Sequence, residues 1–328
     1  QTSSCLLELQ MNPLLQVINL TKHFPSRYGS KNITAVKAVS LTVNAGETVG
    51  IVGESGCGKS TLGKSIIRLL EPDEGTVLFQ DKDVLSLEKR ALREMRCEIQ
   101  MIFQDPYGSL DSRMTIGEIV EEPLVIHGIG DRATRYKMML RMLEITGLDQ
   151  DAANRYPHEF SGGQRQRIGI ARALALRPKL IIADEPVSAL DVSIQSQILN
   201  LLVDLKEKFD LSYIFISHDL AVIEHVSDHV AVMYLGGIVE TAPTKDLFTR
   251  PCHPYTEALI KAIPQPDPLR TREHIVLQGE IPDPENPPSG CAFHPRCPKV
   301  MDICKTETPE EKNIGVNETG HSIRCHLY

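Results

Sequence analysis

The chain has 328 residues, of which 41% are hydrophobic and 24% are charged, so it can bury a full core like an ordinary globular protein. Its net charge of −8 argues against a nucleic-acid partner, because binding a phosphate backbone needs a surplus of Lys and Arg on one face. No uncharged apolar run approaches the roughly 20 residues that cross a bilayer, so we expect this chain to contact a membrane only through a partner. The N-terminus lacks a signal pattern, so we do not expect the chain to be secreted.

Residues 1–11 form a tail that we expect to be an addition to the native sequence. From residue 12 to about residue 250, apolar runs alternate with amphipathic stretches, which is the pattern of an α/β layered fold. Short, almost entirely apolar segments predict buried parallel strands at Val49–Val52, Leu180–Ala183, Tyr213–Ile216 and Val230–Met233. Periodic apolar patterns predict helices at Ser60–Leu70, Lys137–Leu148 and Arg167–Leu176.

The first of these strands is followed by GESGCGKST, residues 53–61, which fits the pattern G-x-x-x-x-G-K-[ST] and opens a helix. Glycines let backbone N–H groups curl round an anion, and the helix directs the positive end of its dipole at it. Lys59 is expected to reach the β- and γ-phosphates of a nucleotide, and the Ser60 hydroxyl to bind Mg²⁺. The alternative is a Gly-rich turn that only resembles such a loop. The predicted nucleotide-binding residues are Gly53, Ser55, Gly56, Cys57, Gly58, Lys59, Ser60 and Thr61, and the side chain of Cys57 is assigned no chemistry.

From about residue 105 to residue 160 the composition shifts toward helix, which predicts a helical insert between strands. The insert is followed by FSGGQRQR, residues 160–167. In it Ser161-Gly162-Gly163 precedes a helix and offers a second potential anion site at a helix N-terminus. The alternative is a plain N-cap with glycine spacers.

The segment LIIADEP, residues 180–186, is an apolar strand that ends in two acids. Because side chains alternate along a strand, Asp184 and Glu185 should lie on opposite sides and have different roles. Asp184 suits Mg²⁺ coordination through a water, and Glu185 suits polarisation of an attacking water as general base; alternatively, both simply end the strand. Gln104 and His218 also follow apolar strands. Either could be an ordinary loop residue, but the carboxyl ends of parallel strands are where α/β sheets place their chemistry.

After residue 250 we predict one short helix, Tyr255–Ile263, and then a Pro-rich connector that marks a boundary. Residues 251–328 form a C-terminal extension with four cysteines: Cys291, Cys297, Cys304 and Cys325. They are separated by five, six and twenty residues, whereas structural zinc sites favour pairs two to four residues apart. A [4Fe–4S] cluster accepts wider spacing. The residues alone leave open such a cluster, a zinc site that could include His294 or His326, and unliganded thiols, while Cys5, Cys97 and Cys252 are interpreted as ordinary residues.

The phosphate loop, Gln104, FSGGQ, LIIADEP, SALD at residues 188–191 and His218 occur in an order and spacing that closely resemble the ATP-binding subunit of ABC transporters over residues 14–240. The resemblance implies an α/β P-loop NTPase core with a mixed sheet, a helical subdomain at about residues 105–165, and ATP hydrolysis with Mg²⁺. It also implies that two subunits pack head to tail. The signature residues of one subunit then cover the γ-phosphate bound by the other, and these residues are Ser161, Gly162, Gly163 and Gln164.

The same resemblance assigns further roles. Gln104 would bind Mg²⁺ and couple to a membrane partner, His218 would contact the γ-phosphate, and Asp191 would form a contact across the dimer. Adenine is expected to stack on Phe24, and Tyr28 is the second candidate. The expected catalytic residues are Glu185, His218 and Lys59, and the expected Mg²⁺ ligands are Ser60, Gln104 and Asp184. Phe160 stands where Leu is commoner, an apolar exchange that should not disturb phosphate contacts.

The stretch HPYTEALIKAIP and the cysteines after it resemble the C-terminal extension of the oligopeptide, dipeptide and nickel subfamily of these ATPases. Some members carry an iron–sulfur cluster here, which favours a structural [4Fe–4S] cluster over Zn²⁺. The resemblance implies a peripheral ATPase on the cytoplasmic face of the membrane. It would energise di- or oligopeptide uptake through transmembrane permease subunits, with an extracytoplasmic binding protein delivering the substrate and a second, identical or paralogous, ATPase subunit.

Other functions remain as alternatives. The cargo could be nickel or another small solute, because this subunit need not touch it. An ABC-type ATPase acting on DNA or ribosomes is disfavoured by the single phosphate loop and the acidic balance. An iron–sulfur module with a vestigial nucleotide fold is disfavoured because Lys59, Asp184, Glu185 and His218 are all present.

Overall fold

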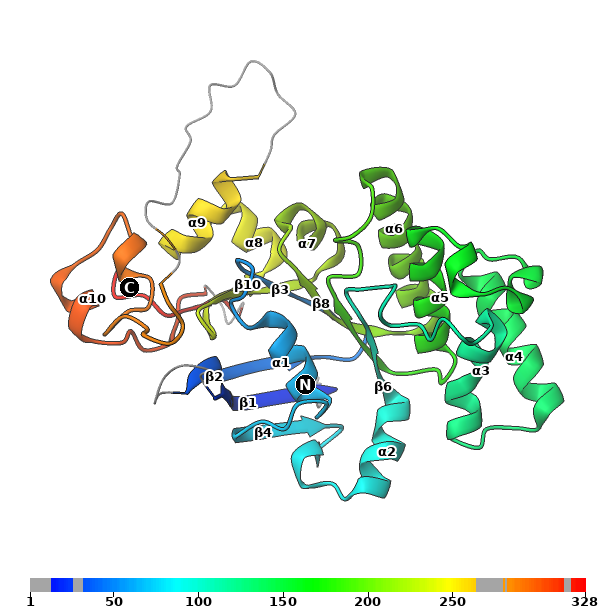
Figure 1. The fold of residues 1–328 in the computed structure, drawn as a ribbon. Helices are drawn as coiled ribbons and strands as arrows, with labels where there is room; N and C mark the ends of the chain where they lie inside the picture. The colour runs from blue at the N-terminus through cyan, green and yellow to red at the C-terminus, as the bar shows by residue number, and fades with distance from the viewer. Residues whose placement is uncertain (1–12, 26–31, 264–279, 281, 316–319) are drawn as a thin grey trace, which may run out of the picture.

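The computed structural model describes residues 13–25, 32–263, 280, 282–315 and 320–328 (Figure 1). It contains a large sheet of order β11-β12-β10-β9-β3-β8-β7-β6 and a small sheet of order β2-β1-β4-β5. The strands of the large sheet are β3 (Thr48–Val52), β6 (Ile99–Ile102), β7 (Leu180–Asp184), β8 (Ser212–Ser217), β9 (His229–Tyr234), β10 (Gly237–Pro243), β11 (Lys312–Asn313) and β12 (Ser322–Ile323). The strands of the small sheet are β1 (Leu15–Phe24), β2 (Ile33–Val43), β4 (Glu74–Phe79) and β5 (Lys82–Asp83).

The centre of the large sheet is parallel. Strands β9, β3, β8, β7 and β6 run in one direction, and β10 joins β9 in the opposite direction, so the predicted mixed sheet is confirmed. All four segments predicted as parallel strands are found, as β3, β7, β8 and β9. Their side chains are buried almost throughout, because helices or the small sheet cover both faces, and this explains their continuous apolar sequences.

The predicted helices are present with shifted ends. The helix after the phosphate loop, α1 (Lys59–Ile66), stops before the predicted Leu70, since Arg68 has a left-handed backbone with φ 56°. The next predicted helix, at Lys137–Leu148, begins earlier and ends before Gly147, as α4 (Arg132–Ile145). The other helices are α2 (Lys89–Glu98), α3 (Ile116–Ile126), α5 (Gly162–Leu174), α6 (Val192–Phe209), α7 (Leu220–Val226), α8 (Thr244–Thr249), α9 (Pro254–Lys261) and α10 (Asp302–Thr306).

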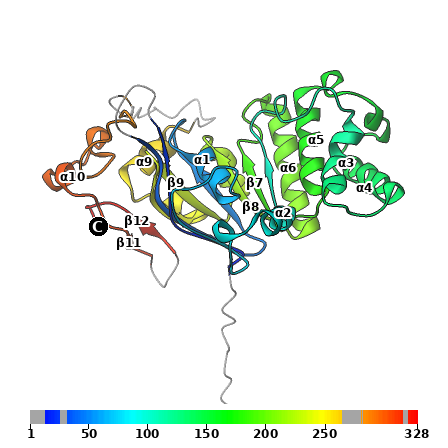
Figure 2. The same cartoon turned by 60° about the horizontal axis from the view of Figure 1, so that its bottom comes forward.

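The helical part and the C-terminal part lie on opposite sides of the molecule. Between β6 and β7 the described chain forms helices and no strand, and α3, α4 and α5 pack on one another. Figures 1 and 2 both place these helices at one end and α10 at the other, where Figure 2 also shows β11. Helix α1, which follows the phosphate loop, lies between these two ends in Figure 1. It packs against β1 and β2 of the small sheet and against β7 and β8 of the large sheet.

The C-terminal extension is attached to the core by a strand and by aromatic packing. Strand β12 pairs with β10, where Glu240 lies opposite Ile323. The buried ring of Phe293 lies 5.2 Å from that of Tyr234 on β9 and 5.3 Å from that of Tyr255 on α9, between ring centroids. The tail of residues 1–11 and most of the Pro-rich connector, including Pro264, Pro266 and Pro268, lie outside the described residues.

Candidate nucleotide site

The phosphate loop has the backbone that its glycines predict. Gly58 has φ 107°, and a Cβ there would lie 2.0 Å from the carbonyl oxygen of Ala35, so no other residue fits this approach of β2. The Lys59 ammonium is buried in the loop, where it donates hydrogen bonds to the carbonyl oxygens of Gly53 at 2.8 Å and Glu54 at 3.0 Å. The loop therefore holds its lysine at the N-terminus of α1.

Asp184, the last residue of β7, points toward this loop. Its Oδ1 accepts a 2.7 Å hydrogen bond from the Ser60 hydroxyl. Burial raises the pKa of Asp184, and the hydrogen bond from Ser60 offsets part of the rise. A hydroxyl and a carboxylate in contact are a pair of oxygen ligands of the kind that Mg²⁺ prefers, so the residues fit the expected metal.

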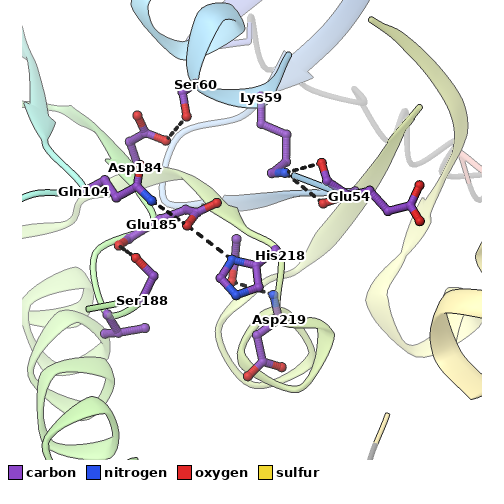
Figure 3. Close-up of polar contacts among 12 residues, drawn as sticks. Glu54, Lys59, Ser60, Gln104, Asp184, Glu185, Ser188, His218 and Asp219 are labelled. Atoms are coloured by element: carbon purple, nitrogen blue, oxygen red, sulfur yellow. Dashed lines mark hydrogen bonds and ion pairs between the residues drawn. The ribbon is translucent and has the colours of Figure 1, made fainter. Parts of the chain in front are cut away.

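Glu185 follows directly and faces another way (Figure 3). It lies just outside β7 in a left-handed conformation, with φ 46°. Its Oε2 accepts a 3.0 Å hydrogen bond from Gln104 Nε2 and lies 3.2 Å from His218 Nδ1. The two acids thus have different partners as predicted, but the cause is this left-handed turn and not the alternation of a strand. Gln104 and His218, each from another strand end, meet at the Glu185 carboxylate.

A pocket of about 560 Å³ opens at this point. Its lining residues are Ser55, Gln104, Asp105, Glu185, Ser188, Ala189 and His218. A residue of the phosphate loop, Ser55, therefore shares a cavity with Glu185, so a phosphate held by the loop would lie near the carboxylate. The arrangement can polarise a water toward a bound phosphate.

The residues 161–164 are not part of this pocket. The Ser161 hydroxyl accepts a hydrogen bond from the backbone N–H of Gln164, and Gln164 Oε1 accepts one from the N–H of Ser161, which is a capping box at the start of α5. A Cβ at Gly163 would lie 2.4 Å from the Ile194 side chain on α6. Asp191 precedes α6 and its side chain makes no cap hydrogen bond. Within one chain these residues have local roles, as the alternative N-cap interpretation expects.

Phe24 ends β1 next to the phosphate loop. It pairs with Ile33 on β2, two residues before Ala35, whose carbonyl oxygen approaches Gly58. The ammonium of Lys22 lies 5.7 Å from the Phe24 ring centroid. The stacking of adenine on Phe24 stays a prediction, and the second candidate, Tyr28, lies outside the described residues.

The four cysteines of the extension lie near one another. The N–H of Cys291 donates to the carbonyl oxygen of Cys304 at 2.9 Å. Burial raises the pKa of Cys291 to about 11, and the nearby thiols of Cys304, Cys325 and Cys297 add to the rise. Within the described residues, no three of these four sulfur atoms all lie within 4.8 Å of one another.

The two histidines considered as zinc ligands make backbone contacts. His294 Nδ1 lies 3.0 Å from the carbonyl oxygen of Cys291, and His326 Nε2 lies 2.9 Å from that of Glu307. These contacts account for one nitrogen of each ring and agree with ordinary loop histidines.

Sequence reasoning missed a buried trio that includes Cys252. Ligand atoms of Glu240, Cys252 and His321 lie within 4.8 Å of one another. The Glu240 carboxylate already accepts hydrogen bonds from the N–H groups of Cys252 at 2.8 Å and His253 at 3.0 Å, and His321 Nε2 lies 2.8 Å away. These contacts explain the buried acid as a tie between β10 and the extension.

Comparison with known proteins identifies the family. Residues 36–188 match the family model described as "ABC transporter", and residues 239–304 match "Oligopeptide/dipeptide transporter, C-terminal region". The chain is 53% identical over 319 residues to "Probable peptide ABC transporter ATP-binding protein y4tS" of Sinorhizobium fredii, covering 96% of this chain and 90% of that protein. The chain belongs to the ABC transporter family.

Other ABC proteins are also similar to this chain. Oligopeptide transport ATP-binding protein AppF of Bacillus subtilis is 50% identical, with 96% of this chain and 97% of AppF covered. The solved dimer of the ATP-binding cassette MJ0796 in a post-hydrolysis state with ADP and Pi is 33% identical, has a TM-score of 0.64 and covers 70% of this chain and 98% of that one. The predicted family and the predicted ATP hydrolysis are confirmed: this chain is a transport ATPase. Among its described helices, none has the length and hydrophobicity to span a membrane.

Proposed function

We propose that this chain is the ATP-hydrolysing subunit of an ABC importer for di- or oligopeptides. The convergence of Gln104 and His218 on Glu185 beside the phosphate loop supports the hydrolytic site. The peptide cargo is supported by relatives named as peptide transport proteins, about half identical over more than nine-tenths of the chain. We assign residues 12–250 to the nucleotide-binding domain, with a helical subdomain at about 105–165, and residues 251–328 to the extension.

The residues act on the nucleotide in separate roles. Lys59 and the loop amides bind the phosphates, and the N-terminus of α1 adds its dipole. Ser60, Asp184 and Gln104 would hold Mg²⁺, which neutralises developing charge on the phosphate oxygens. Glu185 takes the proton of the attacking water, and His218, 3.2 Å from that carboxylate, would contact the γ-phosphate.

A second subunit completes the site. Ser161–Gln164 lie on the helical part and do not line the pocket of Glu185 in their own chain. We propose that the Ser161 hydroxyl and the first N–H groups of α5 instead meet the γ-phosphate held by the partner, and that Asp191 contacts the partner.

Permease subunits are the proposed membrane partners, on the cytoplasmic face. A second pocket, of about 740 Å³, lies beside α3 and includes Gln104, Glu122, Pro123 and Arg172. Because Gln104 borders both pockets, it links this surface to Glu185. That link supports its proposed role in coupling hydrolysis to transport.

Peptide stimulation tests this function. We expect the chain, reconstituted with its permease and binding protein in liposomes, to hydrolyse ATP several times faster when peptide is added. The reason is that hydrolysis needs both ATPase subunits closed, which cargo delivery through the permease would promote. Stimulation by nickel and not by peptide would reassign the cargo, and stimulation by DNA or ribosomes would contradict an importer.

We also propose a structural [4Fe–4S] cluster on Cys291, Cys297, Cys304 and Cys325. The sequence gaps of five, six and twenty residues between these cysteines are wider than the two to four residues that structural zinc sites favour. A cluster of four irons accommodates wider spacing. The thiols would organise an extension too small to bury a large core of its own.

Metal analysis tests the cluster. Protein purified without oxygen should be brown and contain iron and sulfide near four per chain. Cys304→Ser should lose most of both, while Cys97→Ser, a change at a thiol on α2, should keep them. A colourless protein with about one zinc per chain would reject the cluster.

A further inference from the structure

The phosphate loop carries an acid, Glu54, directly after Gly53. A carboxylate in a loop that binds an anion repels its ligand unless its charge is neutralised. Here the carboxylate points away from Asp184 and Glu185 (Figure 3). It forms a two-bond ion pair with Arg296, Nη1 to Oε2 at 2.7 Å and Nη2 to Oε1 at 2.9 Å.

This ion pair is two-pronged and largely shielded from water, which makes it stronger than a surface ion pair. The side chain of Arg296 is only 6% exposed and that of Glu54 only 23%, so water screens them little. Arg296 follows Phe293 in the same turn of the extension, and the Phe293 ring is buried against Tyr234 and Tyr255. The guanidinium is therefore held in place by the packing of the extension on the core.

Tyr255 makes a second contact with the same loop residue. Its hydroxyl oxygen accepts a 2.9 Å hydrogen bond from the backbone N–H of Glu54. Tyr255 is fully buried, with its ring centroid 4.7 Å from that of Tyr234. The carbonyl oxygen of Glu54 in turn accepts a hydrogen bond from Lys59. All three polar groups of Glu54 are thus engaged, two of them by residues that follow position 250.

We propose that the C-terminal extension positions the phosphate loop for ATP. Arg296 neutralises the Glu54 carboxylate. Together with Tyr255 it fixes the Glu54 backbone, whose carbonyl oxygen binds the Lys59 ammonium. Arg296 is a positioning residue, because it acts through Glu54 and does not touch the nucleotide. The proposal rests on the proposed binding of phosphates by residues 53–61, and it does not depend on which metal the cysteines hold.

Two matched substitutions separate charge from side-chain length. Arg296→Gln keeps most of the length but removes the charge, so the negative charge of Glu54 is left without compensation in the loop that binds the phosphates. We expect its KM for ATP to rise at least about tenfold, with a smaller change in kcat. Arg296→Lys keeps the charge, so we expect the KM of this variant for ATP to stay within about threefold of the parent value.

The dependence on Glu54 distinguishes positioning from simple anchoring. In a Glu54→Gln background no charge needs neutralising, so Arg296→Gln should raise KM by less than about twofold. If the ion pair only anchored the extension, Arg296→Gln would lower the melting temperature and leave KM unchanged. An equal rise of KM in both backgrounds would also overturn the proposal, because Arg296 would then act otherwise than through Glu54.

Two controls keep this test apart from the proposed function. Arg324, another arginine of the extension, pairs with Glu311 at 3.1 Å, and Arg324→Gln should leave KM unchanged. Lys59→Ala should abolish nucleotide binding, measured with a fluorescent ATP analogue. If Lys59→Ala bound nucleotide normally, the proposed phosphate site would fail. If it lost binding while Arg296→Gln kept the parent KM, only the positioning role would fail.

Discussion

Glu185→Gln is expected to bind ATP but to hydrolyse it at least about a hundredfold more slowly, the usual contribution of a general base. The amide keeps the size of the carboxylate and can still contact Gln104, which donates to Oε2 at 3.0 Å, so the pocket should keep its shape. It cannot accept the proton of the attacking water. ATP should therefore accumulate in a closed dimer, which size-exclusion chromatography with light scattering would detect beside a steady-state ATPase assay.

The matched control for this substitution is Glu207→Gln, which makes the same exchange at an exposed position on α6. It should show parent kinetics and no ATP-dependent dimer. A Glu185→Gln protein with an unimpaired rate would remove Glu185 from the mechanism. Glu185→Gln monomers that bind ATP without pairing would leave the base in place and contradict the two-subunit site.

Most of the site could be predicted because its residues follow short strands that are easy to recognise. β7 and β8 are buried on both faces, so their sequences are continuous apolar runs with clear ends. Parallel strands bring their carboxyl ends to the same edge, so Glu185 and His218 had to lie near each other. What the pattern did not contain is the left-handed turn at Glu185, which directs its carboxylate to Gln104.

The small antiparallel sheet is not predicted from the sequence, and the reason is its irregularity. The pairing of β1 with β2 shifts register three times, and Asn19 and Ala38 have left-handed backbones. Each interruption moves the following side chains to the other face, which breaks the alternation by which such strands are recognised. β12 is missed for another reason, since a strand of two residues has no periodicity.

The contact between the phosphate loop and the extension could not be predicted either. Glu54 and Arg296 are 242 residues apart, and neither stands at a defined position of a motif. The stretch HPYTEALIKAIP resembled a family sequence, but the resemblance did not say what these residues do in the fold. The structure supplies one, because Tyr255 lies buried beneath the loop and bonds the N–H of Glu54.

Two inactive variants are expected to restore activity when mixed, if each ATP lies between the loop of one chain and Ser161 of the other. Lys59→Ala disables the loop, and Ser161→Asp places a negative charge against the partner's γ-phosphate. Asp is as good an N-cap as Ser, so the start of α5 should survive this change. Each variant alone should lose at least about 99% of its ATPase rate, since both sites of its dimer are defective.

In a mixed dimer one site combines both defects and the other is intact. An equimolar mixture forms such dimers half of the time, so about a quarter of the parent rate should return. Thr134→Asp is the control, because it adds the same charge at an exposed position in the first turn of α4, and it should remain fully active. Because the intact site draws its loop from one chain and its Ser161 from the other, recovery on mixing cannot come from a site built within a single chain. A Ser161→Asp protein that turned over ATP at the parent rate by itself would show that the nucleotide needs no residue of the partner.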